Sequence, residues 1–375
     1  MSPAGIRISA PGKTILAGEH AAVYGRPALV AALDARLDVT VEADPSIDGL
    51  RLALPVLDVD EVVRWDALRA YAADRRRAWE AWHADRDRRD FADVLGTEPA
   101  HLVRVAVGEA LAWVLDHGGE PPSGAILRAV SEIPTGSGFG SSAAASAGCA
   151  TAILALCHVD ADPSVVEALA LDAERRQHGT PSGVDTATVL RGGVVWVDKR
   201  VEQGGGGGLA IEPVEKASTS WLDRLQIVQT GRPAESTGEV VAAVRRLRST
   251  DRQGFERQLA RVTEATLALR EGLRSGTLDA IEPIRTIHRM LDAWGIVPTP
   301  VRAVVEQVEA RGGAAKISGA GSIGGPGAGS LLLHHPDPSA LAGLTFPPLW
   351  RRLDVGFDAG VAGAGLQISE VPRGS

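Results

Sequence analysis

Three glycine-rich segments contain most of the residues that could carry chemistry, and the second gives the clearest physical argument. It reads PTGSGFGSSAA over residues 134–144 and precedes an Ala-rich stretch that predicts a helix from about Ser141. Glycine lets backbone approach a ligand closely, and the N-terminus of a helix offers unpaired N–H groups and a positive dipole end. We therefore predict a phosphate-binding loop, with a plain capped turn as the alternative. Its candidate residues are Gly136, Ser137, Gly138, Gly140, Ser141 and Ser142.

Two carboxylates frame a further segment, ERRQHGTPSGVD, over residues 174–185. Glu174 falls at the end of a predicted helix, and Asp185 follows a Pro-Ser-Gly turn that would hold its carboxylate in a fixed place. A positioned carboxylate can accept the proton of an alcohol, and a serine hydroxyl such as that of Ser142 can reach Mg²⁺. The alternatives are a surface position for Glu174 and a turn-capping role for Asp185.

The remaining two glycine segments do not match other common nucleotide or catalytic motifs. Residues 10–20 read APGKTILAGEH, but the Walker A pattern would need a glycine where Arg7 stands. Residues 316–329 (KISGAGSIGGPGAG) contain G-x-G-x-x-G, yet they lie late in the chain and run into a predicted strand instead of a helix. The serine hydrolase, protein kinase and Cys/His zinc patterns are absent from the sequence.

Composition excludes several classes of protein. The chain has 375 residues, of which 45% are hydrophobic, so it can bury a substantial core. A net charge of −8 argues against nucleic acid or an anionic membrane as a partner. We find no apolar run of the roughly 18 residues that a membrane span needs. The two cysteines, Cys149 and Cys157, are expected to stay reduced, and we predict a cytoplasmic protein.

The pattern of elements predicts a mixed α+β fold with two domains. Strands are expected near residues 6–9, 28–42, 124–130, 193–198, 225–230, 314–318, 330–334 and 363–369. Helices are expected near residues 99–116, 141–157, 163–177, 236–247, 253–275, 279–294 and 299–310. The charged segment 65–94, with Trp79 and Trp82, is interpreted as a solvated helix in preference to a binding surface.

Domain limits follow a change in composition near residues 217–223. We predict an N-terminal domain over 1–221 and a C-terminal domain over 222–370. Five glycines at 204–208 are expected to form a loose hairpin tip. The final residues, 371–375 (VPRGS), resemble the remnant of a protease site and are set aside.

In their order and spacing, these segments resemble the GHMP small-molecule kinases. Within that family they are most similar to the mevalonate kinase branch, across PGKTILAGEHAAVYGRPA (11–28), GSGFGSSAA (136–144), ERRQHGTPSGVD (174–185) and TGRPAEST (230–237). The similarity extends from Ala10 to about Leu333. It departs from the family at Phe139, where Leu is usual, at Thr186, where Asn is usual, and in the third glycine segment.

The resemblance implies a fold, cofactors and residue roles. The implied fold is a two-domain α+β structure, with an N-terminal ribosomal-protein-S5-like domain, a C-terminal ferredoxin-like domain and the active site between them. The implied cofactors are ATP, whose phosphates residues 136–141 would surround, and Mg²⁺. By position, Asp185 is the catalytic aspartate and Lys13 its partner, Ser142 and Glu174 hold the metal, and Glu19, His20 and Thr230 lie near the acceptor.

The reaction implied is ATP-dependent phosphorylation of mevalonate at its 5-hydroxyl, a step in the supply of isoprenoid precursors. Phosphomevalonate, or another acceptor of the same family, is the nearest alternative, and a non-catalytic nucleotide sensor is a third. The expected partner is therefore a small molecule, with neither nucleic acid nor membrane. The sequence does not decide between a monomer and a homodimer.

Overall fold

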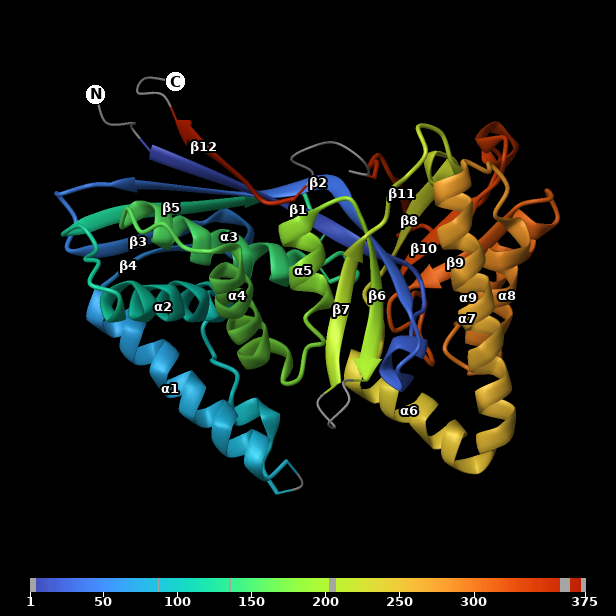
Figure 1. Ribbon diagram of the computed structural model, residues 1–375, viewed down its shortest axis with the longest axis horizontal. Helices are drawn as coiled ribbons and strands as arrows, with labels where there is room; N and C mark the ends of the chain where they lie inside the picture. The colour runs from blue at the N-terminus through green and yellow to red at the C-terminus, as the bar shows by residue number, and fades with distance from the viewer. Residues whose placement is uncertain (1–4, 87, 135, 202–206, 358–364, 372–375) are drawn as a thin grey trace.

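The computed structural model describes residues 5–86, 88–134, 136–201, 207–357 and 365–371. Most of the chain forms two β-sheets and the helices that cover them (Figure 1). This mixture of strands and helices is the α+β class that the sequence predicts. Among the described residues, no helix is both long enough and apolar enough to cross a membrane.

The first sheet has eight strands and is built mainly from the N-terminal half. Its main path runs β12-β1-β2-β5-β3-β4, and β6 extends from β2 to β7. Every pair is antiparallel except β3 with β5. The strands are β1 (Gly5–Ala17), β2 (Ala28–Ala43), β3 (Gly49–Leu54), β4 (Val59–Val63), β5 (Gly124–Ser131), β6 (Val194–Val201), β7 (Gly207–Pro213) and β12 (Gln367–Val371).

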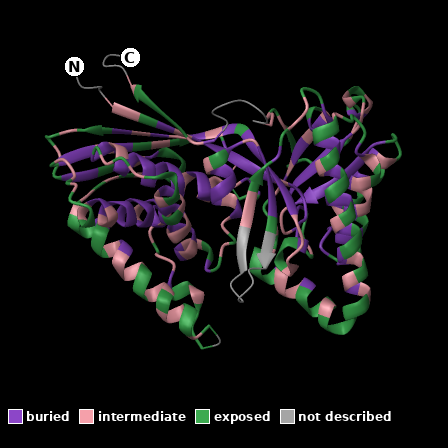
Figure 2. Cartoon of the chain, in the orientation of Figure 1, coloured by how far each residue is buried: buried purple, intermediate pink, exposed green. Residues whose placement is uncertain are grey.

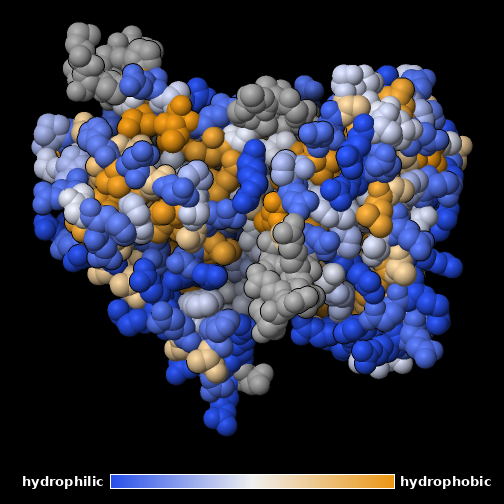
Figure 3. All heavy atoms as spheres, viewed as in Figure 1, coloured by the Kyte–Doolittle hydropathy of each residue, from blue (hydrophilic) through white to orange (hydrophobic). Residues whose placement is uncertain are grey.

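Helices lie on one side of this sheet in successive layers (Figure 1). The Ala-rich α3 packs directly on β1 and β2, with α2 and α4 on its other side, and α1 packs outside α2. The far end of α1, at the bottom of the view, is covered mostly by hydrophilic residues (Figure 3). The helices are α1 (Trp65–Ala84), α2 (His101–Asp116), α3 (Ser141–Leu156), α4 (Pro163–His178) and α5 (Val184–Arg191).

The second sheet has four antiparallel strands in the order β11-β8-β10-β9. The strand order matches the ferredoxin-like arrangement expected for the C-terminal half. Four α-helices lie between β8 and β9, whereas a short 3₁₀ helix (Pro338–Leu341) takes the place of an α-helix between β10 and β11. Its strands are β8 (Leu225–Gly231), β9 (Ala314–Ser318), β10 (Gly329–His334) and β11 (Arg351–Leu353), and its helices are α6 (Thr237–Thr250), α7 (Arg252–Ser275), α8 (Ile281–Ala293) and α9 (Thr299–Glu309).

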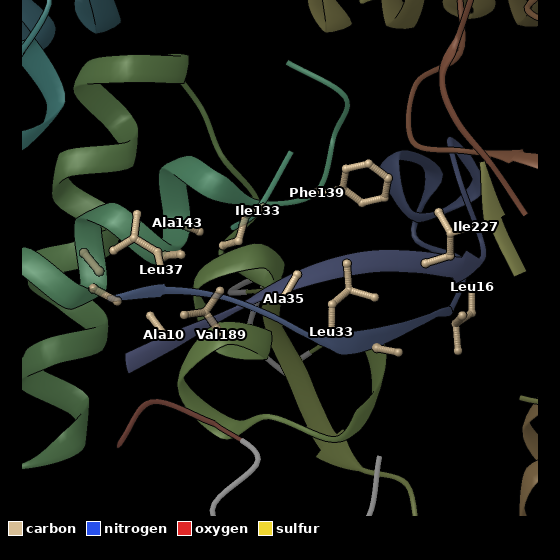
Figure 4. Close-up of a cluster of buried hydrophobic side chains, with 14 of the residues drawn as sticks. Ala10, Leu16, Leu33, Ala35, Leu37, Ile133, Phe139, Ala143, Val189 and Ile227 are labelled. Atoms are coloured by element: carbon tan, nitrogen blue, oxygen red, sulfur yellow. The ribbon is translucent and has the colours of Figure 1, made fainter. Parts of the chain in front are cut away.

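One buried hydrophobic cluster extends from the first sheet into the second (Figure 2). Figure 4 draws part of it, where Phe139 of the second glycine loop and Ile227 of β8 belong to the same cluster as Leu33 of β2. Phe139 is 1% exposed. Phe139, where the resemblance leads us to expect Leu, is therefore a core side chain that links the two halves.

The structure differs from the predicted elements at several places. Strands β3, β4, β7 and β11 and the short helix α5 were not predicted, and β1 continues through Lys13 to Ala17 instead of ending at Ser9. Helix α1 ends at Ala84, ten residues before the predicted end. Most of the glycine run at 204–208 lies outside the described residues.

The chain end returns to the first sheet. Strand β12 pairs with β1, so residues 367–370 lie with the N-terminal strands although they fall within the predicted C-terminal range. Val371, which the sequence analysis set aside, pairs with Gly5 as the last residue of that strand, and residues 372–375 lie outside the described residues.

Candidate active site

An irregularity in β1 places Lys13 at the candidate site. The pairing register with β2 shifts between Pro11 and Lys13, and such a break in the ladder changes the direction in which side chains point. The Lys13 backbone N–H donates to the carbonyl of Phe139 at 2.9 Å. A side chain on Gly12 would lie 3.1 Å from that same oxygen, so the close approach of the two segments favours glycine here.

Lys13 and Asp185 form an ion pair. Lys13 Nζ lies 3.0 Å from Asp185 Oδ2, and the Lys13 side chain is only 6% exposed whereas that of Asp185 is 43% exposed. An incoming molecule can therefore reach the Asp185 carboxylate, while the buried Lys13 ammonium balances its negative charge from the protein interior.

Local backbone geometry brings Asp185 to this place. Helix α4 ends at His178, and the segment that follows contains Gly179 at φ 78° and Gly183 at φ 82°, conformations that favour glycine. Asp185 then lies in the first turn of α5, where an acidic residue interacts favourably with the helix dipole.

The second glycine loop fits the phosphate-binding site that its sequence predicts. Gly136 (φ 72°) and Gly138 (φ 80°) are exposed, and a Cβ on either would meet nothing within 4 Å, so their backbone is open to a ligand. Gly140 (φ 75°) differs, since a Cβ there would lie 2.7 Å from the Lys13 side chain. No side chain caps the N-terminus of α3, so the first backbone N–H groups of this helix, which follow the glycine loop, are not hydrogen-bonded by a capping side chain.

Four polar side chains, those of Ser142, Ser146, Glu174 and His178, meet near Asp185. Ser142 Oγ donates to Glu174 Oε2 at 3.1 Å and also lies 3.1 Å from His178 Nε2. Ser146 Oγ donates to the other Glu174 oxygen at 3.1 Å. Burial, reinforced by the charge of Asp185, raises the pKa of Glu174 to about 7. Within the described part of the chain, no Lys or Arg lies within ion-pair distance of this carboxylate.

Glu19 and Lys316 form a second ion pair that is sealed from solvent. Lys316 Nζ donates to Glu19 Oε1, and the two side chains are 1% and 0% exposed. Burial raises the pKa of Glu19 and lowers that of Lys316. This pair joins the loop after β1 to strand β9 of the second sheet. It neutralises Glu19, a residue that the sequence analysis placed beside the acceptor.

His20 and Thr230, the other predicted acceptor residues, are both buried. His20 Nε2 lies 2.8 Å from the carbonyl of Ala320, while its Nδ1 is buried with no hydrogen-bond partner among the described residues. The Thr230 hydroxyl donates to Gly329 O at 3.1 Å and accepts from Ala328 N at 2.8 Å. The Thr230 hydroxyl is therefore engaged by the third glycine segment.

Glu235 binds residues 322–324 of the third glycine segment, where the sequence departs from the expected pattern. Its carboxylate accepts from Ser322 Oγ, from Ile323 N at 3.0 Å and from Gly324 N at 3.1 Å. This segment ends against the second glycine loop, because a Cβ on Gly329 would lie 3.2 Å from the carbonyl of Ser137. The three glycine segments thus support one another across the two sheets.

The structure brings together Lys13, Asp185, Ser142, Glu174 and the second glycine loop. It adds Lys316 and Glu235, which the sequence did not single out, and His178, which the sequence favoured as a helix-end group over a catalyst. Lys316, His178 and Glu235 each contact a predicted site residue or loop. Lys316 carried a usable signal, because it is one of only four lysines in the sequence. In the described residues, no group of three or more His, Cys, Asp or Glu could hold a metal ion.

Comparison with protein families agrees with this geometry. Residues 104–193 match the GHMP kinases N terminal domain. That stretch contains the second glycine loop, Glu174 and Asp185. The mevalonate kinase of Methanothermobacter thermautotrophicus is 29% identical over 332 residues, which cover 88% of this chain and 89% of that protein.

Solved structures have the same fold. The mevalonate kinase of L. major in complex with R-mevalonate superposes with a TM-score of 0.66 at 20% identity, covering 96% of this chain and 97% of that one. The Streptococcus pneumoniae phosphomevalonate kinase in complex with phosphomevalonate and AMPPNP has a TM-score of 0.65 at 16% identity, covering 92% and 99%.

Proposed function

The chain belongs to the GHMP kinase family of ATP-dependent small-molecule kinases, and from that premise we propose that it phosphorylates the 5-hydroxyl of mevalonate. The observation that carries the proposal is the 3.0 Å pair between Lys13 and the half-exposed Asp185, directly beside the second glycine loop. Relatives that align along most of the chain and are named mevalonate kinase support this choice of acceptor.

Asp185 would accept the proton of the acceptor hydroxyl as the new O–P bond forms. The Lys13 ammonium lies 3.0 Å from this carboxylate, balances its charge and holds it in place. Phosphoryl transfer otherwise depends on positioning and on neutralising charge, with little covalent work for the protein. Lys13 would contribute to both positioning and charge neutralisation, since its side chain is buried and its ammonium group is held beside Asp185.

The second glycine loop would hold the phosphates of ATP. The open backbone at Gly136 and Gly138, followed by the uncapped N-terminus of the 16-residue helix α3, is the arrangement that binds anions. Ser137 is held from behind, because Gln229 of β8 donates to its hydroxyl at 2.9 Å. The second sheet thereby supports the loop on the side away from the ligand.

Ser142 and Glu174 fit a Mg²⁺ ion. The Glu174 side chain is 4% exposed, and no Lys or Arg of the described chain lies within ion-pair distance of it, so a bound cation would add positive charge next to its carboxylate. Mg²⁺ uses few protein ligands because it keeps waters and phosphate oxygens. When bound, it would neutralise charge on the β- and γ-phosphates.

The acceptor is tested by comparing mevalonate with 5-phosphomevalonate, because a phosphomevalonate kinase shares the fold. We expect kcat/KM for mevalonate to be at least ~10-fold higher, which corresponds to roughly 1.4 kcal/mol. ADP release is measured with both acceptors at matched concentrations, and ³¹P NMR identifies the product. A reversed preference would assign the chain to the phosphomevalonate branch and leave the roles of Lys13 and Asp185 intact.

We also propose that residues 1–221 and 222–370 are the two domains. Strands β1 to β7 belong to the first sheet and β8 to β11 to the second, which supports a division between Pro213 and Leu225. Strand β12 crosses back to the first sheet. Lys13, the second glycine loop and Asp185 all come from the first sheet's side, while Lys316, which pairs with Glu19, and Glu235, which holds the third glycine segment, come from the second.

A further inference from the structure

We propose that Trp79 is a positioning residue for the catalytic segment, holding the loop at 179–183 from which Asp185 extends. This inference rests on the role proposed for Asp185. Trp79 lies in α1, in the charged segment that the sequence analysis interpreted as a solvated helix. Its indole Nε1 donates to the carbonyl of Gly179 at 2.7 Å.

The loop has little else to hold it. Gly179 and Gly183 both have positive φ, and glycine residues lose the most conformational freedom on ordering. The other backbone hydrogen bonds of residues 179–183 lie within the segment or join it to its flanking helices. Among the described residues, Trp79 is the one side chain from another part of the chain that hydrogen-bonds to the backbone of this loop.

Trp79 also packs on the last turn of α4. The guanidinium carbons of Arg175 and Arg176 lie 5.8 and 5.5 Å from the centre of its ring, within cation–π range. Glu174 and His178 belong to this same turn. Trp79 is therefore placed to fix both the carboxylate proposed to bind the metal and the start of the loop that leads to Asp185.

A neighbouring pair of aromatic residues, Trp82 and Phe91, packs against the same loop at Gly179. Trp82 packs edge-on against Phe91 with ring centres 4.9 Å apart. A Cβ on Gly179 would lie 2.9 Å from Trp82 Cη2 and 3.3 Å from Phe91 Cε2, so the loop backbone lies directly on these rings. A small displacement of a catalytic group can cost on the order of 10²-fold in rate, so a loose loop would act on kcat.

The chain offers a matched control in the same helix. Trp65, at the start of α1, donates its indole N–H to the carbonyl of Pro122 at 2.9 Å. Trp65→Phe and Trp79→Phe thus each remove one indole-to-carbonyl hydrogen bond and keep an aromatic ring. Only Trp79→Phe releases the catalytic loop.

The experiment measures three quantities on the full chain: kcat and KM for ATP, hydrogen exchange of residues 176–186, and Tm. For Trp79→Phe we expect kcat to fall about 10-fold, with KM for ATP within about twofold of wild type and faster exchange in 176–186. Trp65→Phe should lower Tm by a similar amount and change neither kcat nor that exchange. If Trp79→Phe does not fold, Trp79→Tyr is used, since it also lacks the indole N–H.

The possible results separate this proposal from the proposed function. If wild type prefers another alcohol, the variants are compared with that acceptor, so a wrong acceptor does not affect the test. Faster exchange with unchanged kcat would overturn the positioning role, as would an equal loss of kcat in Trp65→Phe. Unchanged exchange in 176–186 would overturn it regardless of any kinase activity.

Discussion

Two lysine–carboxylate pairs, built from the same residue types, occupy very different surroundings in this molecule. Lys13 and Asp185 meet within the N-terminal half, and the Asp185 side chain is 43% exposed. Lys316 and Glu19 meet across the two sheets, and neither side chain is more than 1% exposed. The first pair can be reached by a substrate, whereas the second cannot.

The difference in burial therefore gives the two ion pairs different roles. Removing two charges from water costs several kcal/mol per ion, and their mutual attraction roughly repays it, so a buried pair contributes little net stability while losing one partner is expensive. A half-exposed carboxylate keeps its hydration and is free to take a proton. We infer that the buried pair joins the two halves and that the open pair performs the chemistry.

The largest effect is expected from Asp185→Asn. The amide cannot accept a proton, so kcat should fall on the order of 10²–10⁴-fold while ATP affinity changes little. Steady-state kinetics and nucleotide titration measure the two quantities. Lys13→Met, which removes the other member of the open pair, should also act mainly on kcat. Activity of Asp185→Asn within threefold of wild type would remove this residue from the role of base.

Lys316→Met tests the sealed pair. The variant leaves Glu19 buried without its cation, so we expect a loss of about 3–5 kcal/mol in unfolding free energy. Urea unfolding measures it. The double variant Glu19→Gln/Lys316→Met removes both charges and should recover most of that stability. If Lys316→Met were as stable as wild type but inactive, this pair would belong to the chemistry and the comparison between the two pairs would fail.

Glu174→Gln and Ser142→Ala test whether the region beside the exposed Lys13–Asp185 pair binds Mg²⁺. Each removes a charge or an oxygen proposed to hold Mg²⁺, and the Mg²⁺ concentration for half-maximal activity should rise about 10-fold or more. The titration is run at fixed ATP. Ser146→Ala is the control, because it removes a hydrogen bond to Glu174 from the buried side. Saturation of both test variants at the wild-type concentration would show that Ser142 is only part of the helix start.

The smallest effect is expected from Glu235→Gln. Gln keeps one acceptor oxygen and loses the charge that attracts Ser322 and two backbone N–H groups, so about 1 kcal/mol of loop stability should be lost. Because the third glycine segment touches Ser137 in the second, KM for ATP should rise a few-fold with little change in kcat. An effect on kcat alone would place Glu235 closer to the reaction than this geometry allows.

The main secondary structure and the glycine loop that leads into α3 could be predicted from sequence because both are local. Helix α3 follows the glycine loop at Ser141 as expected, and the α+β class is confirmed. Strands β3 and β4 and helix α5 were missed because they are short: α5 has eight residues, and β4 has five, none of them buried. Such elements are stabilised by pairing and packing with distant residues, which a short window of sequence does not reveal.

Sequence alone determined which residues are able to do chemistry: the glycine spacing at 136–140, the two carboxylates at 174 and 185, and Lys13. It did not determine their partners. Glu19 carries a carboxyl group just as Asp185 does, and only folding pairs it with a lysine 297 residues away and seals both from water. Burial depends on which segments pack together, and burial decides whether a charged side chain holds the structure or meets a substrate.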